Sequence, residues 1–388
     1  MKLTNNRYYF DFNATSPLSE SVLDWLRKGD LPFGNPSSIH STGKAAKREI
    51  TAVKNYLLED LFFVADTHKL FFHSGASEAI NTFLTGSCHT GLKEKKSLHV
   101  FISSVDHSAA YNQKEEVEAL GMNFTILPVS EDGMPLIDQW TYEIEKSKAD
   151  YKILNFTWVN NETGVVWPLE QVLELKKKTG VFVHVDSVQS VGKIEDWSKL
   201  EDKLDAYTFS GHKFGSLKGI GFSFVKENFP FEAMIRGGGQ QDGYRSGTEN
   251  VPGILSLKLA LEDLSKRFDA KKVYEGITYL REKIYDLGES SLLFPSRSSL
   301  QNLTTINFVV PGTKADILMT AFDLAKMDVS SGSACSSGAV LPSRVLMSMG
   351  VSEEDAKSAL RFSFSPYLTL SEAEEFWAKI EKVLSRFL

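Results

Sequence analysis

The fold is decided by residues 152–185, where KILNFT (152–157) and VFVHV (181–185) flank LEQVLELKKK (169–178). The two flanking runs are short and apolar, which is typical of buried strands. The run between them is Lys-rich and helical in character. A strand, a helix and a second strand in this order predict parallel strands joined by a crossover helix.

The same alternation extends in both directions from this unit. Further short apolar runs that predict strands lie at 70–73, 100–103, 124–127, 206–209 and 220–225. Helices are expected between some of these runs, at 76–87 and 109–120. The middle of the chain is therefore predicted to be an α/β domain with a mainly parallel sheet.

The pattern changes after Pro252. A long helical stretch at 254–268 leads into charged helices with fewer strands, the clearest of which lies at 304–310. The run at 9–12 looks extended and is expected to join this second part. We therefore predict two domains, with these limits: a large domain at 14–253, and a small domain made of 1–13 and 254–388.

Composition narrows the class of protein. The 388 residues include 43 Lys and Arg and 50 Asp and Glu, a formal net charge of −7. Nucleic-acid binding usually requires a basic face, so we expect none. The two cysteines, Cys88 and Cys335, are too few for a disulfide framework and fit a reducing compartment. We see no signal-peptide pattern and no apolar run near the ~18 residues that a membrane helix needs, so a cytoplasmic protein without a membrane segment is expected.

Polar loops follow three of the predicted strands, where open α/β sheets bind their ligands. In HSGASE (73–78), small residues and a helix start could hold a phosphate, although taken alone the loop is better explained as an ordinary turn with a Ser cap. In HVDSVQ (184–189), Asp186 ends an apolar strand, where a carboxylate is costly without a partner. A protonated pyridine nitrogen would be such a partner, and a helix-capping role is the alternative.

Lys213 in the third loop, FSGHKFG (209–215), has the setting of a reactive lysine. It follows an apolar strand and stands among small and aromatic residues. Partial burial lowers the pKa of a lysine and favours a Schiff base. Taken by itself, however, a Lys is far more often an exposed loop residue than a reactive one.

Taken together, these loops resemble in order and spacing the aminotransferase class V group of pyridoxal-phosphate enzymes, and within it the cysteine desulfurases. The resemblance covers nearly the whole chain. It is carried by YFDFNAT (9–15), FGNPSS (33–38), SGASE (74–78), DH (106–107), VNNETG (159–164), HVD (184–186), SGHK (210–213), RSGT (245–248), SSGSAC (330–335) and LRFS (360–363). It implies fold type I of the pyridoxal-phosphate transferases, with a mainly parallel sheet in a large domain and a smaller α+β domain.

The resemblance also implies which residues hold pyridoxal 5'-phosphate. Lys213 would form the Schiff base, Asp186 would pair with the pyridine nitrogen, and His107 would stack on the ring and help to move protons. Gln189 and Asn161 would lie near the ring hydroxyl. The phosphate would be bound by Ala76, Ser77, Ser210 and His212. Thr248 would reach the phosphate of a neighbouring subunit, so a homodimer is implied.

Substrate binding and sulfur transfer are implied at the far end of the chain. Arg361, helped by Asn13 and Asn35, would hold the carboxylate of L-cysteine, because a guanidinium meets a carboxylate with two parallel hydrogen bonds. Cys335 would accept the sulfur. Its Ser- and Gly-rich surroundings suit a flexible carrier; composition alone favours a chance cysteine in a surface linker, and the resemblance reverses that preference. The spacing from Cys335 to PSRVL (342–346) matches the long-loop branch, which includes housekeeping and nitrogen-fixation desulfurases.

A few positions depart from the family pattern without removing an essential group. The family usually has Thr, Ser and Glu where Ser77, Ala79 and Asp106 stand. Cys88 and His89 are adjacent, but two ligands without a second pair make a metal site unlikely, and we take Cys88 as structural.

The expected function is a cysteine desulfurase that converts L-cysteine to L-alanine and passes sulfur to an iron–sulfur scaffold or a thiolation carrier. A selenocysteine lyase, a cysteine sulfinate desulfinase and a non-catalytic sulfur-relay binding protein are the alternatives. Housekeeping members continue past their last helix into a tail that helps to dock the scaffold. Because this chain ends at Leu388, we expect weaker docking.

Overall fold

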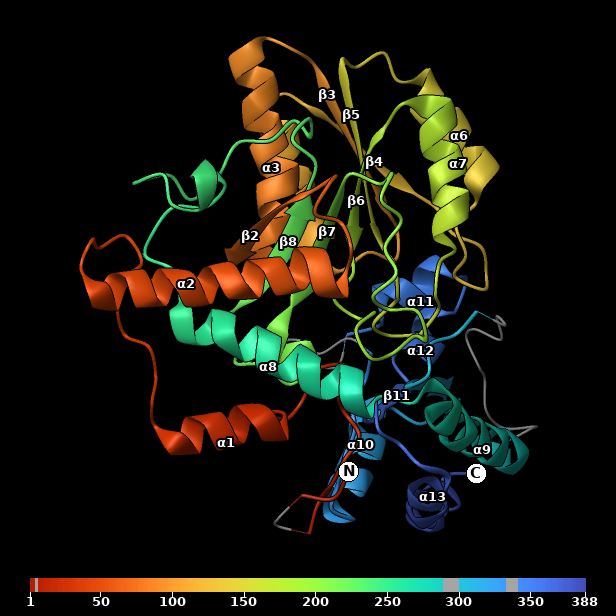
Figure 1. The fold of residues 1–388 in the computed structure, drawn as a ribbon. Helices are drawn as coiled ribbons and strands as arrows, with labels where there is room; N and C mark the ends of the chain where they lie inside the picture. The colour runs from red at the N-terminus through yellow and green to blue at the C-terminus, as the bar shows by residue number, and fades with distance from the viewer. Residues whose placement is uncertain (4–5, 289–299, 333–340) are drawn as a thin grey trace.

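A central sheet organises the molecule (Figure 1). The computed structural model describes residues 1–3, 6–288, 300–332 and 341–388. Within them, seven strands follow the order β2-β8-β7-β6-β5-β3-β4. Their bounds are β2 Lys69–His73, β3 Leu98–Ser103, β4 Asn123–Leu127, β5 Tyr151–Thr157, β6 Phe182–Asp186, β7 Ala206–Ser210 and β8 Gly221–Val225. The neighbours from β4 to β7 are parallel, and β8 runs antiparallel to β2 and β7, which confirms the predicted mainly parallel sheet.

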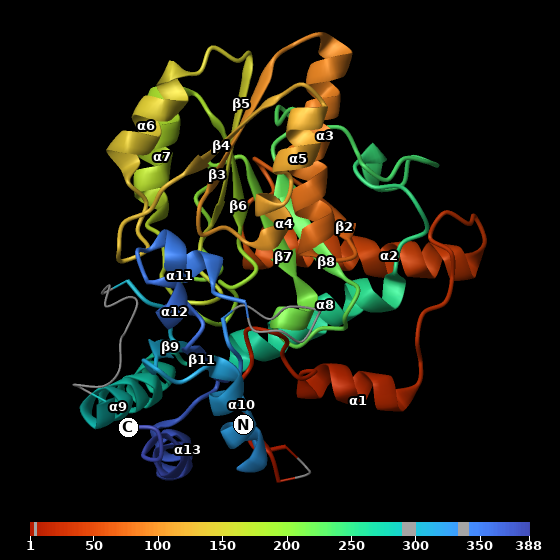
Figure 2. The same cartoon turned by 180° about the vertical axis from the view of Figure 1, so that it is seen from behind.

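Helices cover both faces of this sheet, as the two opposite views show (Figures 1 and 2). One face packs against α2 (Ser41–Asn55), α6 (Ile137–Lys146), α7 (Leu169–Thr179) and α8 (Val251–Arg267). The other packs against α3 (Ala76–Glu94), α4 (Ser108–Tyr111) and α5 (Lys114–Ala119). The sheet is thus the middle of three layers, and its strands are buried on both sides, which explains their continuous apolar runs.

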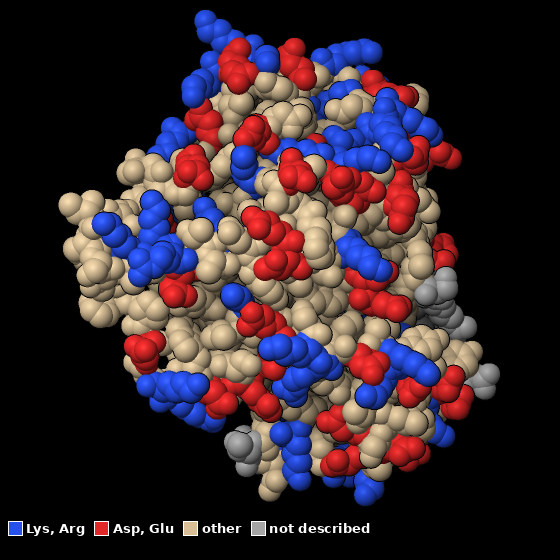
Figure 3. All heavy atoms as spheres, in the orientation of Figure 1, with Lys and Arg blue, Asp and Glu red and all other residues tan. Residues whose placement is uncertain are grey.

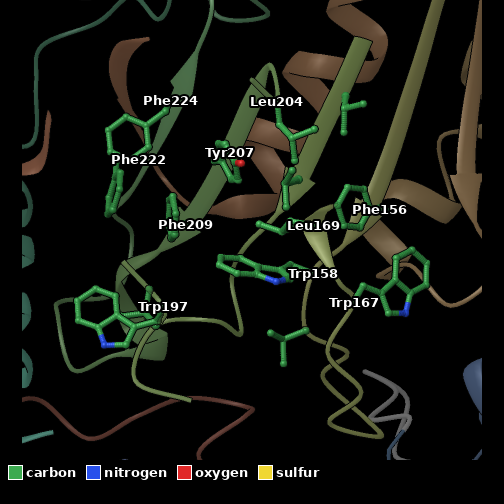
Figure 4. Close-up of a cluster of buried hydrophobic side chains, with 14 of the residues drawn as sticks. Phe156, Trp158, Trp167, Leu169, Trp197, Leu204, Tyr207, Phe209, Phe222 and Phe224 are labelled. Atoms are coloured by element: carbon green, nitrogen blue, oxygen red, sulfur yellow. The ribbon is translucent and has the colours of Figure 1, made fainter. Parts of the chain in front are cut away.

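The core under the first face is rich in aromatic rings (Figure 4). Phe209 on β7 and Phe222 on β8 stack with ring centroids 4.8 Å apart, and both are fully buried. Burying one such side chain contributes roughly 1.5–3 kcal/mol, so this cluster fixes the strands whose ends carry the polar loops.

A second, smaller core gathers both ends of the chain, which lie together in Figure 1. Its strands are β1 (Tyr8–Tyr9) paired with β10 (Met327–Asp328), and β9 (Thr305–Val309) paired with β11 (Ala359–Ser363). Its helices are α9 (Ala270–Gly288), α10 (Ala315–Leu324) and α13 (Leu370–Leu384). The buried residues of α11 (Arg344–Ser348) and α12 (Glu353–Ala356) belong to the first core, and α1 (Glu20–Lys28) packs beside α8. Tyr8 and Phe10 are buried among residues of α9, β9, β11 and α13, although the domain limits themselves stay a prediction.

Two helices differ from their predicted course. The helix expected at 109–120 is interrupted between α4 and α5, where the side chain of Gln113 is buried against α3. The Gln113 side chain accepts a hydrogen bond from Thr85 Oγ1 at 2.6 Å and donates one to Asn81 Oδ1 at 2.8 Å. Helix α3 runs past residue 87 to Glu94 and ends where Lys95 adopts a left-handed conformation.

Acidic and basic side chains are interspersed over the face shown in Figure 3. No helix in the described ranges combines the length and the apolar character that crossing a membrane requires.

Candidate active site

A cavity of about 670 Å³ opens where the carboxyl ends of β5, β6 and β7 meet the start of α3. Many residues singled out from the sequence line it: Asn13, Ala76, Ser77, His107, Asn161, Asp186, Gln189, Ser210, His212 and Lys213. They come from segments up to 200 positions apart in the chain, which the parallel strands bring to one edge of the sheet.

Asp186 is the last residue of β6 and forms the floor of the cavity. Its side chain is buried, and Oδ1 accepts the backbone N–H of Val188 at 3.0 Å. Burial raises the pKa of Asp186, while His107 opposes the shift. No described cation lies within ion-pair distance, so the carboxylate lacks the partner that a protonated ring nitrogen would supply.

Lys213 ends a short 3₁₀ turn, Gly211–Lys213, that follows β7. Its Nζ donates to the backbone oxygens of Asn13 at 2.7 Å and Ala14 at 2.8 Å. Burial, and then the nearby Arg361 guanidinium, lower the pKa of Lys213 to about 8. A substantial fraction of this amine is therefore neutral near physiological pH, as a nucleophile must be.

The start of α3 forms a cradle suited to an anion. Ser74 does not cap this helix: its hydroxyl donates to the Glu78 carboxylate at 2.5 Å, and the N-cap residue Gly75 makes no side-chain cap among the described residues. The first N–H groups of a 19-residue helix thus face the cavity beside Ser210 and His212. Open N–H groups at a helix start bind phosphate, so the cradle fits the phosphate role more closely than the simple capped turn.

His107 lies in the loop after β3, and hydrogen bonds on both sides of this loop hold it in place. Its Nδ1 accepts the N–H of Ala109 at 3.1 Å, and its partial removal from water lowers its pKa, which Asp186 opposes. Behind it, Asp106 accepts the N–H of Thr157 at 2.7 Å and the Nδ2 of Asn155 at 2.8 Å. Arg344 donates to the backbone oxygen of Asp106, which holds the backbone next to His107 in place.

Arg361 lies behind the cavity rather than in its described lining. The side chain is buried, with Nη2 in an ion pair with Asp11 Oδ1 at 2.8 Å and Nη1 donating to the Asn161 oxygen at 3.0 Å. Its Nε has no partner among the described residues. Arg361 is thus oriented by a carboxylate and keeps donor capacity beyond the two hydrogen bonds described.

Three predicted residues lie elsewhere. Asn35 is in the exposed loop before α2, where Oδ1 accepts from Ser37 N at 2.9 Å, and it is not part of the described lining of the cavity. Thr248 is exposed and lines a smaller neighbouring cavity of about 180 Å³. Cys335 lies outside the described residues. Cys88, taken as structural, is fully buried inside α3, and burial raises its pKa to about 12.

Three further residues at the site were missed by the sequence reasoning: Asp11, Lys193 and Arg344. Asp11 and Arg361 are lone opposite charges in the apolar runs 8–12 and 360–364, a signal that could have paired them. Lys193 and Arg344 carry no such signal, since each contacts the site across a long stretch of chain.

Comparison with known proteins agrees with this geometry. The family model described as Aminotransferase class-V matches residues 8–376. A cysteine desulfurase of Cereibacter sphaeroides is 32% identical, covering 95% of this chain and 93% of the relative. A putative cysteine desulfurase IscS 1 of Bacillus subtilis is 32% identical, and the match covers 98% of this chain and 99% of the relative. The solved structure of a NifS-like protein from Rickettsia africae matches with a TM-score of 0.84 at 28% identity, covering 98% of this chain and 99% of the other. The chain belongs to the aminotransferase class V family, and the two relatives that it resembles are a cysteine desulfurase and a putative cysteine desulfurase.

Proposed function

We propose that this protein is a pyridoxal-phosphate-dependent cysteine desulfurase. The observation that carries the proposal is the placement of Lys213 and Asp186 at the ends of adjacent strands, facing one cavity. In the overall reaction, the bond from sulfur to the β-carbon of L-cysteine breaks and a bond from that sulfur to Cys335 forms. L-cysteine and the Cys335 thiol thus give L-alanine and a Cys335 persulfide, without an external oxidant or reductant.

The described residues fit the cofactor at both of its ends. Asp186 would hold the ring nitrogen, the start of α3 with Ser210 and His212 would hold the phosphate, and Gln189 and Asn161 would face the ring hydroxyl. When bound, the pyridoxal ring withdraws electrons from the α-carbon of an attached amino acid.

The chain's own groups would position the substrate and move its protons. Lys213, with its pKa lowered to about 8, is suited to take the α-proton and return it. His107 would lie against the ring. Arg361, already oriented by Asp11, would receive the substrate carboxylate through its remaining donor capacity.

The role of Cys335 is supported by the segment that leads to it. Arg361 N donates to the Ser330 oxygen at 2.6 Å, and Ser330 N donates to the Arg361 oxygen at 3.2 Å. The backbone five residues before Cys335 is therefore paired with the predicted carboxylate-binding residue. The described chain therefore comes within five residues of Cys335 while still paired with Arg361, which supports a role for Cys335 in the same reaction.

A homodimer would account for the residues that lie away from the cavity. Phe33 and Ile39 flank Asn35 and are 90% and 88% exposed, which is unusual for large apolar side chains in one short loop. A second subunit covering this loop would bury them and could bring Asn35 and Thr248 to its own cavity. We further propose a cytoplasmic location and delivery of sulfur to an iron–sulfur scaffold or a thiolation carrier.

The proposal is tested by incubating the protein with L-cysteine and a dithiol, and measuring sulfide and alanine in the same samples. Equal amounts of both are expected. Parallel reactions with selenocysteine and cysteine sulfinate separate a desulfurase from a selenocysteine lyase and a sulfinate desulfinase. Failure to form alanine from any of the three would contradict the proposal and favour a non-catalytic sulfur-relay protein.

A further inference from the structure

A second lysine, Lys193, lies buried behind the cavity and plays no part in the reaction described above. Its side chain is 2% exposed, and Nζ donates to two amide oxygens: Oδ1 of Asn13 at 3.0 Å and Oε1 of Gln189. Both partners line the cavity. The sequence gap between Lys193 and Asn13 is 180 positions, so this contact is a product of the tertiary fold.

The surroundings of Lys193 disfavour a charge. No described carboxylate lies within ion-pair distance of it; Lys213 and Arg361 are the nearby cations, and Asp11, the nearby anion, is paired with Arg361. Burial, followed by the repulsion of Lys213 and Arg361, holds the pKa of Lys193 well below its usual range. A neutral amine has two N–H donors, and here it faces two amide oxygens, so donors and acceptors match in number.

These two hydrogen bonds fix which way both amides point. With its oxygen turned to Lys193, Gln189 directs Nε2 to the Asn13 backbone oxygen at 3.0 Å. With its oxygen also turned to Lys193, Asn13 directs Nδ2 to the Asn161 oxygen at 2.9 Å and to Thr305 Oγ1 at 3.0 Å. Each NH₂ group has two hydrogens, so the second hydrogen of Gln189 remains available to the cavity.

We propose that Lys193 is a positioning residue that makes Gln189 present an N–H group, rather than its carbonyl oxygen, to a negatively charged oxygen on the bound cofactor. This inference rests on the proposed function and adds a determinant of cofactor binding. The alternative amide orientation would turn Oε1 toward the Asn13 backbone oxygen, where an acceptor would meet an acceptor, and it would take from Lys193 one of its two acceptors. It would also turn a carbonyl oxygen toward an anion. Lys193 and the Asn13 backbone oxygen together disfavour that orientation.

The test measures equilibrium binding of pyridoxal phosphate to cofactor-free protein by absorbance, without using turnover. Lys193→Met keeps an unbranched side chain, one heavy atom shorter, and removes both donors. It is expected to weaken binding about 10-fold or more, the effect of losing one hydrogen bond to a charged group. Lys176→Met is the matched control. Lys176 pairs with Asp205, which directly precedes β7 and so lies at the amino ends of the strands, away from the cavity at their carboxyl ends. It should bind as wild type does.

A double substitution separates positioning from general damage. If Lys193 acts through Gln189, Lys193→Met should weaken binding little when made in a Gln189→Ala protein. Gln189→Glu, which leaves Lys193 in place but has no N–H to present, should also weaken binding. Wild-type affinity in Lys193→Met or in Gln189→Glu would overturn the inference, and so would an equal loss with and without Gln189. Wild-type protein that binds no pyridoxal phosphate would instead refute the proposed function.

Discussion

Asp11 and Arg361 form an ion pair of 2.8 Å that joins the first residues of the chain to β11 behind the cavity. The Arg361 side chain is 5% exposed and that of Asp11 is 20% exposed, so water screens the pair poorly. The orientation of the predicted substrate-binding guanidinium therefore depends on a residue about 350 positions earlier.

Replacing Asp11 with Asn should impair cysteine use without emptying the cofactor site. Asn keeps an oxygen acceptor for Arg361 but removes the charge that orients it. We expect kcat/KM for cysteine to fall about 10-fold, the usual effect of weakening a charge-assisted hydrogen bond. Steady-state kinetics measure this, with cofactor absorbance as the control. An unchanged kcat/KM would show that Asp11 does not orient Arg361 for the substrate.

Arg361→Lys should be a poor substitute although it keeps the charge. An ammonium cannot make two parallel hydrogen bonds to a carboxylate, nor can it contact Asp11 and Asn161 with fixed geometry. A loss of about 2 kcal/mol or more in transition-state stabilisation, at least ~30-fold in kcat/KM, is expected. If kcat/KM for the variant equals that of wild type, another group holds the substrate carboxylate.

The attachment of pyridoxal phosphate to cofactor-free protein should depend on pH through Lys213. Its pKa is lowered from 10.5 to about 8, so the amine is mostly protonated below pH 8 and mostly neutral above it. Because only the neutral amine attacks the aldehyde, the attachment rate should rise as pH increases through about 8 and then level off. Stopped-flow absorbance between pH 6 and pH 11 measures the profile. A midpoint near 10.5 would contradict the buried environment assigned to Lys213.

The two cysteines should behave differently. Cys335→Ala is expected to bind L-cysteine and change the cofactor absorbance, but to release little sulfide, because the sulfur acceptor is gone. Cys88→Ala removes a buried thiol whose Sγ donates to the Leu84 oxygen at 3.4 Å, so a small loss of stability and nearly full turnover are expected. Sulfide assays on both variants decide this. Full sulfide release by Cys335→Ala would remove Cys335 from the reaction.

The sequence was most informative where chemistry follows a strand directly. Asp186 and Lys213 each end or follow a buried apolar run, and the alternation of strands with helices places such positions on one edge of a parallel sheet. The fold class and the residues lining the cavity could therefore be anticipated from local patterns together with the family resemblance.

The contacts that support these residues could not be anticipated, because each depends on tertiary packing. Lys193 has the local sequence of an ordinary surface lysine near a turn, yet the fold buries it against Asn13. The break between α4 and α5 follows from bonds between Gln113 and α3, which no helical period reveals. Asn35 and Thr248 lie away from the cavity of their own chain, and a single sequence does not show whether a second subunit uses them.

Lys213 is expected to hold pyridoxal phosphate opposite Asp186. The most direct measurement treats the cofactor-loaded protein with borohydride, which makes the link to the amine permanent, and then maps the modified peptide by mass spectrometry. One pyridoxyl group per chain is expected on Lys213, and none in Lys213→Ala. Modification of another lysine in place of Lys213, or equal labelling of the Lys213→Ala protein, would contradict it.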